Sequence, residues 1–264
     1  MTPNPRALIT GASAGIGRSY AEQLARTGHS LVLVARRADR LNALADELRR
    51  GHGVEVEVLP ADLSTAEGVG VVAARIGGEP PIDLLVNNAG YASRGRVSEL
   101  NADALEEMLR VNIIALSRLS VAAMKRMVEL GRGRIINVAS GTVFMQLPGN
   151  AGYGASKNYV MGFTRTMQAE AQGTGVQVQL LIPGVIATDF HEIAGNRLSN
   201  FPPERVMQAG DLVSASLRAL EMNEPVCIPS LPDIKDWDAY VAAERTLNPQ
   251  VSRDRVAPRY QRGS

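Results

Sequence analysis

The fold is decided by residues 6–17, Arg-Ala-Leu-Ile-Thr-Gly-Ala-Ser-Ala-Gly-Ile-Gly, which lead from an apolar strand through a glycine-rich turn into a helical stretch at 18–26. Strand, glycine turn and helix in this order present the backbone N–H groups of the helix start to a phosphate. The glycine spacing is G-x-x-x-G-x-G, which differs from the usual dinucleotide spacing G-x-G-x-x-G and from the loop G-x-x-x-x-G-K-S/T. One glycine could mark a plain turn, but three in this context predict a phosphate-binding turn.

Apolar runs and helical patterns alternate along the rest of the chain. The expected later strands are 31–34, 54–59, 82–86, 134–140, 176–182 and 225–228. Strands that alternate with helices of this length predict a parallel sheet with helices on both faces. We find no repeat, low-complexity tract or linker, so we expect one α/β domain over residues 1–264.

Composition restricts the class of protein. The 264 residues carry a net charge of +1 with both signs scattered, which gives no sign of a nucleic-acid surface. The single cysteine, Cys227, fits a reducing compartment. No apolar run reaches the ~18 residues of a membrane span, and the first residues lack the pattern of a secretion signal. We therefore expect a cytoplasmic protein with a small-molecule ligand, no nucleic-acid or membrane partner, and no metal, since the three histidines are dispersed.

The second expected strand ends in Ala35-Arg36-Arg37. A dinucleotide fold that prefers NAD has an acid near this point for the ribose 2′-hydroxyl, whereas arginine accommodates the 2′-phosphate of NADP. Here two guanidinium groups follow the strand and no carboxylate stands at its end. The alternative is the solvated start of the helix expected at 39–50. We expect NADP(H).

Polar or small residues also follow the other expected strands. They are Asp62-Leu63, Asn87-Asn88-Ala89-Gly90, Ser140 and Pro183-Gly184. Such residues at the carboxyl ends of strands suit a crevice in which a ligand lies against the backbone. Asn112 is a polar exception inside the helical pattern 101–130, so it is either a packing residue or a site residue.

Tyr153 and Lys157 lie four residues apart at the start of an expected helix, so their side chains share one face. A tyrosine has a reference pKa near ~10. A neighbouring cation stabilises the phenolate and would bring that pKa closer to neutral, which suits proton transfer. The pair alone is weak evidence, because Tyr and Lys at this spacing occur by chance on many helices.

Together these motifs resemble the short-chain dehydrogenase/reductase family, in its NADP-preferring type, over roughly residues 5–228. The resemblance implies a doubly wound, Rossmann-type parallel sheet with strand order 3-2-1-4-5-6-7 and interconversion of a ketone and a secondary alcohol. It implies the catalytic residues Asn112, Ser140, Tyr153 and Lys157. It implies the cofactor-binding residues Gly11, Ser13, Gly15, Ile16, Gly17, Arg36, Arg37, Asp62, Leu63, Asn88, Ala89, Gly90, Tyr153, Lys157, Pro183, Gly184, Ile186 and Thr188.

In these roles Ser140 would hydrogen-bond the carbonyl oxygen, Tyr153 would donate the proton and Lys157 would lower the tyrosine pKa. The resemblance also implies that Asn112 holds a water for reprotonation and that the protein forms a homodimer or homotetramer.

The substrate is expected at the same edge of the sheet. The segment 141–150 carries Val143, Phe144, Met145 and Leu147, and a lid over about 189–209 carries Phe190 and Phe201. These side chains suggest an apolar pocket, although several could simply pack the loops onto the core. The lid also holds His191 and Ile193, and residues from about 229 to 264 form a C-terminal extension outside the motifs.

Two other functions remain open. One is reduction of a 3-oxoacyl thioester on an acyl carrier protein, for which Arg126, Arg132 and Arg165 could form a basic docking patch. The other is a non-catalytic NADP(H) sensor on the same fold. The sequence identifies neither the substrate nor its stereochemistry.

Overall fold

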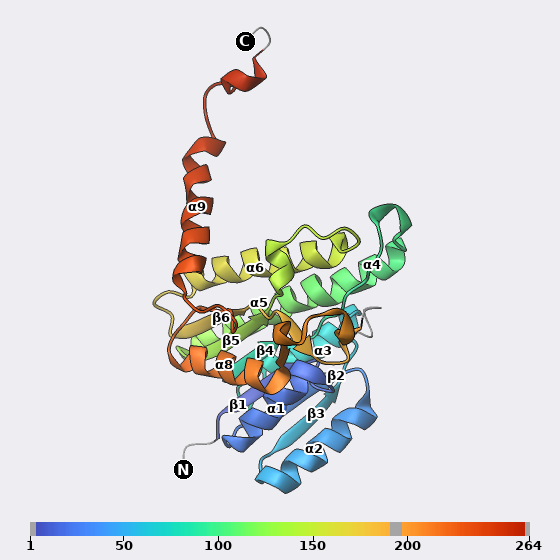
Figure 1. Cartoon of the computed structure of the whole chain (residues 1–264). Helices are drawn as coiled ribbons and strands as arrows, with labels where there is room; N and C mark the ends of the chain where they lie inside the picture. Colours follow the sequence, from blue (N-terminus) through green and yellow to red (C-terminus); the bar gives the residue numbers. More distant parts are fainter. Residues whose placement is uncertain (1–3, 191–196, 262–264) are drawn as a thin grey trace. The chain divides into compact units, whose positions relative to one another are not determined.

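The computed structural model of the protein describes residues 4–190 and 197–261. These residues group into two compact units, Met1–Pro229 and Ser230–Ser264. The larger unit holds a parallel sheet (Figure 1). Its strands are β1 (Arg6–Thr10), β2 (Ser30–Ala35), β3 (Val56–Pro60), β4 (Leu84–Asn87), β5 (Gly133–Val138), β6 (Val176–Leu181) and β9 (Val226–Cys227).

The strand order is β3-β2-β1-β4-β5-β6-β9, and every adjacent pair is parallel. This confirms the expected doubly wound sheet and its order. The order reverses between β1 and β4, so the carboxyl ends of these two strands flank the crevice where such sheets bind ligands. The strand ends differ from the expected ranges by no more than two residues.

Helices cover both faces of the sheet (Figure 1). One face carries α1 (Gly15–Arg26), α2 (Ala38–His52) and α8 (Ala209–Glu221). The other carries α3 (Ala66–Gly77), α5 (Leu116–Leu130) and α6 (Ala151–Glu170), and α4 (Ala102–Leu109) precedes α5. Short 3-10 helices are η1 (Val97–Glu99), η3 (Gly141–Phe144), η4 (Leu198–Asn200), η5 (Pro203–Arg205) and η6 (Pro258–Tyr260).

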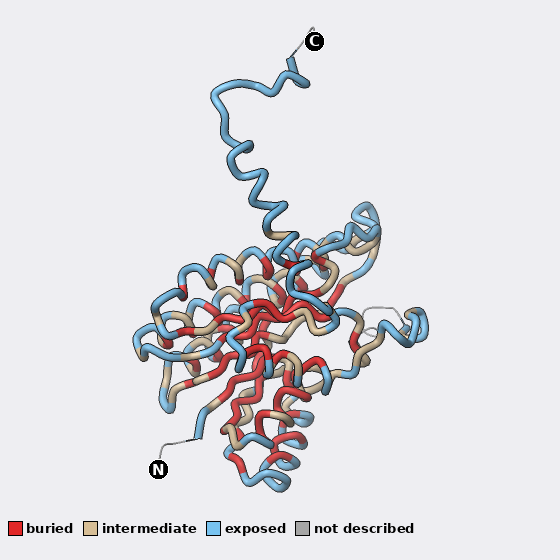
Figure 2. Tube along the Cα trace, turned by 60° about the vertical axis from the view of Figure 1, so that its left-hand side comes forward, coloured by how far each residue is buried: buried red, intermediate tan, exposed pale blue. Residues whose placement is uncertain are grey.

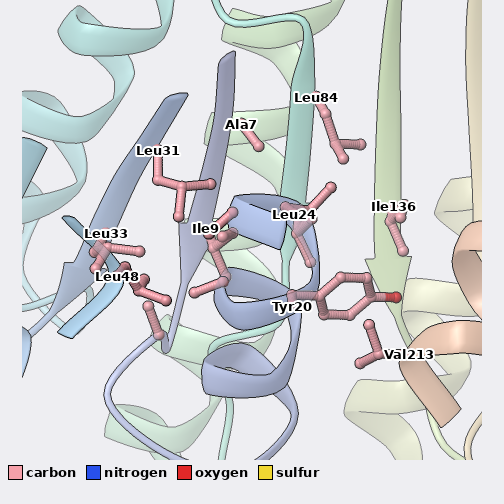
Figure 3. Close-up of a cluster of buried hydrophobic side chains, with 14 of the residues drawn as sticks. Ala7, Ile9, Tyr20, Leu24, Leu31, Leu33, Leu48, Leu84, Ile136 and Val213 are labelled. Carbon is pink, nitrogen blue, oxygen red and sulfur yellow. The ribbon is translucent and has the colours of Figure 1, made fainter. Parts of the chain in front are cut away.

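The strands are buried on both faces, and Figure 2 shows the buried residues concentrated in the sheet and in the helix faces against it. Figure 3 shows the core on the α1 side, where Tyr20 packs near Leu24 and Val213. The Tyr20 hydroxyl is fully buried and donates to Ser216 Oγ at 2.5 Å. This bond ties α1 to α8 and holds the helix that starts at the glycine turn.

A second, two-stranded parallel sheet pairs β7 (Val185–Ala187) with β8 (Val206–Gln208). The sequence did not predict it, because each strand has only three residues and no turn signal joins them. The pair brings together the two ends of the expected lid. His191 and Ile193, named for that lid, lie outside the described residues.

The unit Ser230–Ser264 contains α9 (Lys235–Val251). Most of this helix is exposed, and the rings of Trp237 and Tyr240 lie tilted to one another with centroids 5.4 Å apart. Among the described residues of the whole chain, no helix combines the length and apolar character needed to cross a bilayer.

Candidate active site

A cavity of about 630 Å³ lies at the carboxyl ends of four neighbouring strands. Gly11 follows β1, Asn88 follows β4, Ser140 follows β5 and Pro183 follows β6, and all four line the cavity. Another cavity, of about 910 Å³, opens near the amino ends of the strands around Asp83, and no predicted catalytic residue lines it. The predicted residues therefore converge on the first cavity.

The glycine turn forms one end of this cavity. Gly11 and Gly15 have φ values of +68° and +54°, which glycine adopts without strain. A Cβ on Gly17 would lie 2.3 Å from the Gly11 carbonyl oxygen, so only glycine lets the helix approach the turn this closely. The first turn of α1 has no acidic residue, and its N-cap residue, Ala14, makes no side-chain cap. The helix start thus offers free amides to a diphosphate, and these residues fit a dinucleotide.

Asn88 holds this turn in place. Its Nδ2 donates to the Thr10 carbonyl oxygen at 2.9 Å, while the Thr10 hydroxyl accepts from the backbone N–H groups of Asn88 and Ala89, both at 3.0 Å. The ends of β1 and β4 are thereby joined across the switch point. Asn88 was predicted as a cofactor contact, and the structure shows its amide bonded to the backbone of the turn. The part played by Thr10 was not predicted.

The two arginines after β2 lie beside polar partners. The Arg37 Nη2 atom is 3.5 Å from Ser13 Oγ, and Arg36 Nη1 is 3.9 Å from Glu107 Oε1 on α4. Both arginines are exposed, as a phosphate-binding group at the rim of a site would be. Glu107 was not identified from the sequence, because it belongs to an ordinary charged helix face and meets Arg36 only through the fold.

Asp62 and Leu63 follow β3 and take different positions. Burial would raise the pKa of Asp62, but hydrogen bonds from Ser64 and the charge of Arg36 outweigh it, so the pKa is lowered. Asp62 Oδ1 accepts from Ser64 N at 2.9 Å and from Ser64 Oγ at 2.8 Å. Leu63 is buried in the core beneath the α3 face. The carboxylate is thus ionised and oriented, while the Leu63 side chain packs in the interior.

Tyr153 and Lys157 lie in the first two turns of α6 and are both buried. The Tyr153 side chain and that of Ser140, which arrives from the end of β5, line the same cavity, and Ser140 acts to lower the tyrosine pKa. Ser140 Oγ also accepts from Thr142 N at 3.3 Å, so Ser140 caps η3 as well as contacting the tyrosine. Lys157 Nζ donates to the Val138 carbonyl oxygen at 2.9 Å. The sequence prediction that these side chains meet in one pocket is consistent with this geometry.

The pKa of Tyr153 differs from the expectation. Burial raises it to about 12, against the lowering effects of the Ser140 hydrogen bond and of the Arg94 charge. Lys157 does not reverse this, because its ammonium is directed at a backbone carbonyl and lies 5.7 Å from the centre of the tyrosine ring. Burial also lowers the pKa of Lys157 to about 8. The expected lowering of the tyrosine pKa is therefore wrong for the protein without cofactor, and the tyrosine stays protonated at neutral pH.

Asn112 lies in a π-helical segment, Arg110–Ala115, between α4 and α5. Its Oδ1 accepts from Tyr91 N at 3.1 Å, and its Nδ2 donates to the Tyr91 carbonyl oxygen at 3.0 Å and to Ser156 Oγ at 3.1 Å. A Cβ on Gly90 would lie 2.9 Å from Asn112 Oδ1 and 3.5 Å from Lys157 Nζ. The amide therefore holds the backbone after β4, and its oxygen and the lysine ammonium both border the space beside Gly90. π-Bulges occur often at functional sites.

The outer part of the cavity is largely apolar. Met145, Leu147, Phe190 and Phe201 line it, and the rings of Phe190 and Tyr153 have centroids 5.8 Å apart. Of the predicted substrate residues, Phe190 lines the cavity, whereas Val143 and Phe144 are not among its lining residues. The cavity also contacts residues named for cofactor binding, at its inner end: Gly15, Ile16, Ala89, Gly90, Gly184, Ile186 and Thr188. Within 4–190 and 197–261, no group of three potential ligands could hold a metal.

Residues 5–197 match the sequence model of the family described as short chain dehydrogenase. A solved short-chain dehydrogenase from Sphingobium yanoikuyae, in complex with NADPH, is 38% identical with a TM-score of 0.93, covering 97% of this chain and 100% of that chain. A bulky-bulky ketone specific alcohol dehydrogenase from Comamonas testosteroni is 34% identical with a TM-score of 0.89, covering 98% of this chain and 99% of that chain.

A human protein named inactive hydroxysteroid dehydrogenase-like protein 1 is 33% identical over 186 residues. The match covers 70% of this chain and 56% of that protein, so the chain spans little more than half the length of this curated relative.

Proposed function

Because the chain belongs to the short-chain dehydrogenase family, we propose that it is an NADPH-dependent reductase that converts a ketone into a secondary alcohol. The observation that carries this proposal is a single cavity that is lined by the glycine turn at one end and by Ser140, Tyr153 and Lys157 at the other. The cavity therefore has one end that can bind a diphosphate and another end that can donate a proton.

The protein's own groups act on the carbonyl oxygen. When bound, the cofactor supplies a hydride to the carbonyl carbon. Negative charge then builds on the oxygen, which the Ser140 hydroxyl stabilises by a hydrogen bond. Tyr153 gives its hydroxyl proton to this oxygen, and its high pKa keeps that proton in place at neutral pH until it is needed. Lys157 supplies a cation below the tyrosine ring.

The preference for NADPH over NADH is part of the proposal. Arg36 and Arg37 follow β2 with exposed guanidinium groups, and Ala35 stands where an acid would bind the ribose hydroxyls. The solved relative from Sphingobium yanoikuyae holds NADPH. A two-cation rim suits a 2′-phosphate and has no carboxylate partner for a 2′-hydroxyl at the strand end.

For the substrate we propose a ketone with large groups on both sides of the carbonyl. The inner end of the cavity is assigned to the cofactor, and the outer part left for the substrate is lined by the apolar side chains of Met145, Leu147, Phe190 and Phe201. The alcohol dehydrogenase from Comamonas testosteroni, similar over 98% of this chain, is described as specific for bulky-bulky ketones. An apolar cavity with one polar end is typical of small-molecule sites.

The structure gives the acyl-carrier alternative little support. Arg126 is ion-paired with Glu79 and Glu129, and Arg132 with Asp83 at 3.0 Å. A patch whose cations are already neutralised is poorly suited to an acidic carrier protein. The family also includes a protein named inactive, so a sensor function must be excluded by experiment.

The test follows NADPH consumption with bulky aryl ketones by the full chain and by Tyr153→Phe. We expect Tyr153→Phe to lower kcat by about 10²–10⁴-fold, because the proton donor is lost. Tyr159→Phe is the matched control, since Tyr159 lies on the same helix but is exposed and bonded to Ser117. Full activity in Tyr153→Phe would overturn the mechanism, and equal kcat/KM for NADPH and NADH would overturn the cofactor preference.

We further propose a cytoplasmic homodimer or homotetramer that assembles through the helices carrying Asn112 and Tyr153. Large apolar side chains are exposed there, including Ile114, Val121 and Tyr159. Light scattering of the purified chain would test the assembly.

A further inference from the structure

The outer part of the catalytic cavity carries an excess of positive charge. Among residues 4–190 and 197–261, its charged lining residues are Arg94, Lys157, Asp189 and Arg205. Lys157 lies at the closed end and donates to the Val138 carbonyl. The other three are exposed side chains from separate segments: Arg94 from the loop after β4, Asp189 after β7 and Arg205 at the end of η5. Of the described side chains at this rim, two are guanidinium groups and one is a carboxylate, so the cations outnumber the anion among them.

The two arginines are also unengaged within the described residues. Across 4–190 and 197–261, neither the Arg94 nor the Arg205 side chain makes a hydrogen bond or an ion pair. Some arginines elsewhere in the fold are held by carboxylates, as Arg75 is by Glu57 at 2.8 Å and Arg18 by Glu47 at 2.7 Å. Arg94 and Arg205 differ from other exposed arginines because they line the catalytic cavity. A guanidinium group that faces a cavity without an internal acceptor is available to a ligand.

Arg94 also lies within electrostatic reach of the reacting group. Its charge lowers the pKa of the buried Tyr153 hydroxyl, against the larger opposite effect of burial. Apolar side chains line the same part of the cavity, including Met145, Leu147 and Phe190. A ketone whose oxygen meets Tyr153 would therefore extend along an apolar wall toward guanidinium groups.

We propose that the substrate is an oxo acid, a ketone that carries a carboxylate separated from the carbonyl by a hydrocarbon spacer, and that Arg94 and Arg205 bind this carboxylate. The inference rests on the proposed reductase function and specifies its substrate class. Guanidinium and carboxylate form paired, charge-assisted hydrogen bonds, whereas an uncharged ketone leaves both arginines without an acceptor. Asp189 lies at the same rim and opposes binding of a second anionic group.

The experiment compares two bulky diaryl ketones of nearly equal size, 4-benzoylbenzoate and 4-benzoylbenzamide, with NADPH and the full chain. We expect kcat/KM for the acid to exceed that for the amide by about 10- to 100-fold, the range of a charge-assisted hydrogen bond. Arg94→Gln should remove most of this ratio by raising KM for the acid, whereas any change in kcat through the Tyr153 pKa should affect both ketones equally and leave the ratio unaffected. Arg205→Gln should reduce the ratio. The ratio should also fall with added salt, because the arginines are exposed.

Arg96→Gln is the matched control, since Arg96 is an exposed arginine two residues from Arg94 that does not line the cavity. It should leave the ratio unchanged. The oxo-acid proposal is wrong, while the reductase function stands, if the amide is reduced at least as well as the acid. It is also wrong if Arg94→Gln and Arg96→Gln show the same ratio of kcat/KM for the acid to kcat/KM for the amide. If neither ketone nor any bulky aryl ketone consumes NADPH, the reductase function itself has failed.

Discussion

Replacing the buried Lys157 by methionine should make the cofactor-free protein more stable while abolishing reduction. Lys157 is 4% exposed, and its ammonium donates to the Val138 carbonyl oxygen at 2.9 Å. Burial lowers its pKa to about 8 from the reference value of 10.5. A pKa difference of this size lowers the free energy of unfolding of the wild type by about 3 kcal/mol at pH 7. Lys157→Met would recover this stability but lose the hydrogen bond to Val138, which costs about 1 kcal/mol.

The sign of the pH dependence follows from the direction of the shift. Above the unfolded pKa the lysine is neutral in both states, and no cost arises. As the pH falls toward 8, the unfolded chain takes up the proton first, so stability decreases and the full cost is reached below the folded pKa of about 8. The wild type should therefore gain stability between pH 8 and pH 10.5 relative to Lys157→Met.

The assay is denaturant unfolding of the cofactor-free protein at pH 7 and pH 10. At pH 7 the free energy of unfolding of Lys157→Met should exceed that of the wild type by about 2 kcal/mol, which corresponds to a Tm about 4–8 °C higher. At pH 10 this difference in stability should be smaller. Lys125→Met is the control, because Lys125 is exposed on α5 and a surface change there should shift stability by less than about 0.5 kcal/mol. A Lys157→Met protein less stable than wild type, or a gap independent of pH, would refute the reasoning.

Three further predictions concern Glu107, Gly17 and Tyr153. Glu107→Gln should tighten NADPH binding by about two- to fivefold and leave NADH binding unchanged, because it removes a carboxylate that competes with the cofactor for Arg36. Binding is measured by fluorescence titration, and the control is Glu106→Gln, because Glu106 is ion-paired with Arg110 and not with Arg36. Gly17→Ala should lower stability by about 1–3 kcal/mol and abolish NADPH binding in the same titration, because its Cβ would clash with the turn. Because the pKa of Tyr153 is raised to about 12, kcat/KM for ketone reduction should stay flat from pH 6 to 7 and should fall above the Lys157 pKa of about 8, where the catalytic cation is lost. Below pH 8, alcohol oxidation should rise about tenfold per pH unit, and a flat oxidation profile there would contradict the assignment.

The sheet could be predicted because its signals are local and repeated. Each strand is a short apolar run, and each carboxyl end carries residues that a ligand crevice needs, such as Gly11 and Ser140. Asn112 was found through a single anomaly, an amide in an apolar helical pattern. The structure explains that anomaly by a π-helical segment whose backbone distortion places the amide against Tyr91.

Other parts of the site have no local signal. Glu107 and Arg94 are charged residues in charged surroundings, and only the fold brings them to Arg36 and to the cavity of Tyr153. The strands β7 and β8 are too short to show a period. The pKa of Tyr153 was predicted in the wrong direction, because the spacing of Tyr153 and Lys157 specifies a shared helix face but not the burial of the hydroxyl or the carbonyl that takes the ammonium.

The stability cost of Lys157 also links the site to its cofactor. A ligand that binds only the folded state stabilises it by mass action, by about 2.7 kcal/mol at a hundred times its Kd. If the cofactor offers a hydrogen-bond acceptor to the Lys157 ammonium, it removes part of the cost of burying that charge. The free energy recovered adds to the affinity of the protein for the cofactor. Lys157→Met would lose this added affinity while gaining stability without the cofactor. Catalysis and stability therefore oppose each other at this side chain, and NADPH should raise the Tm of wild type more than that of Lys157→Met.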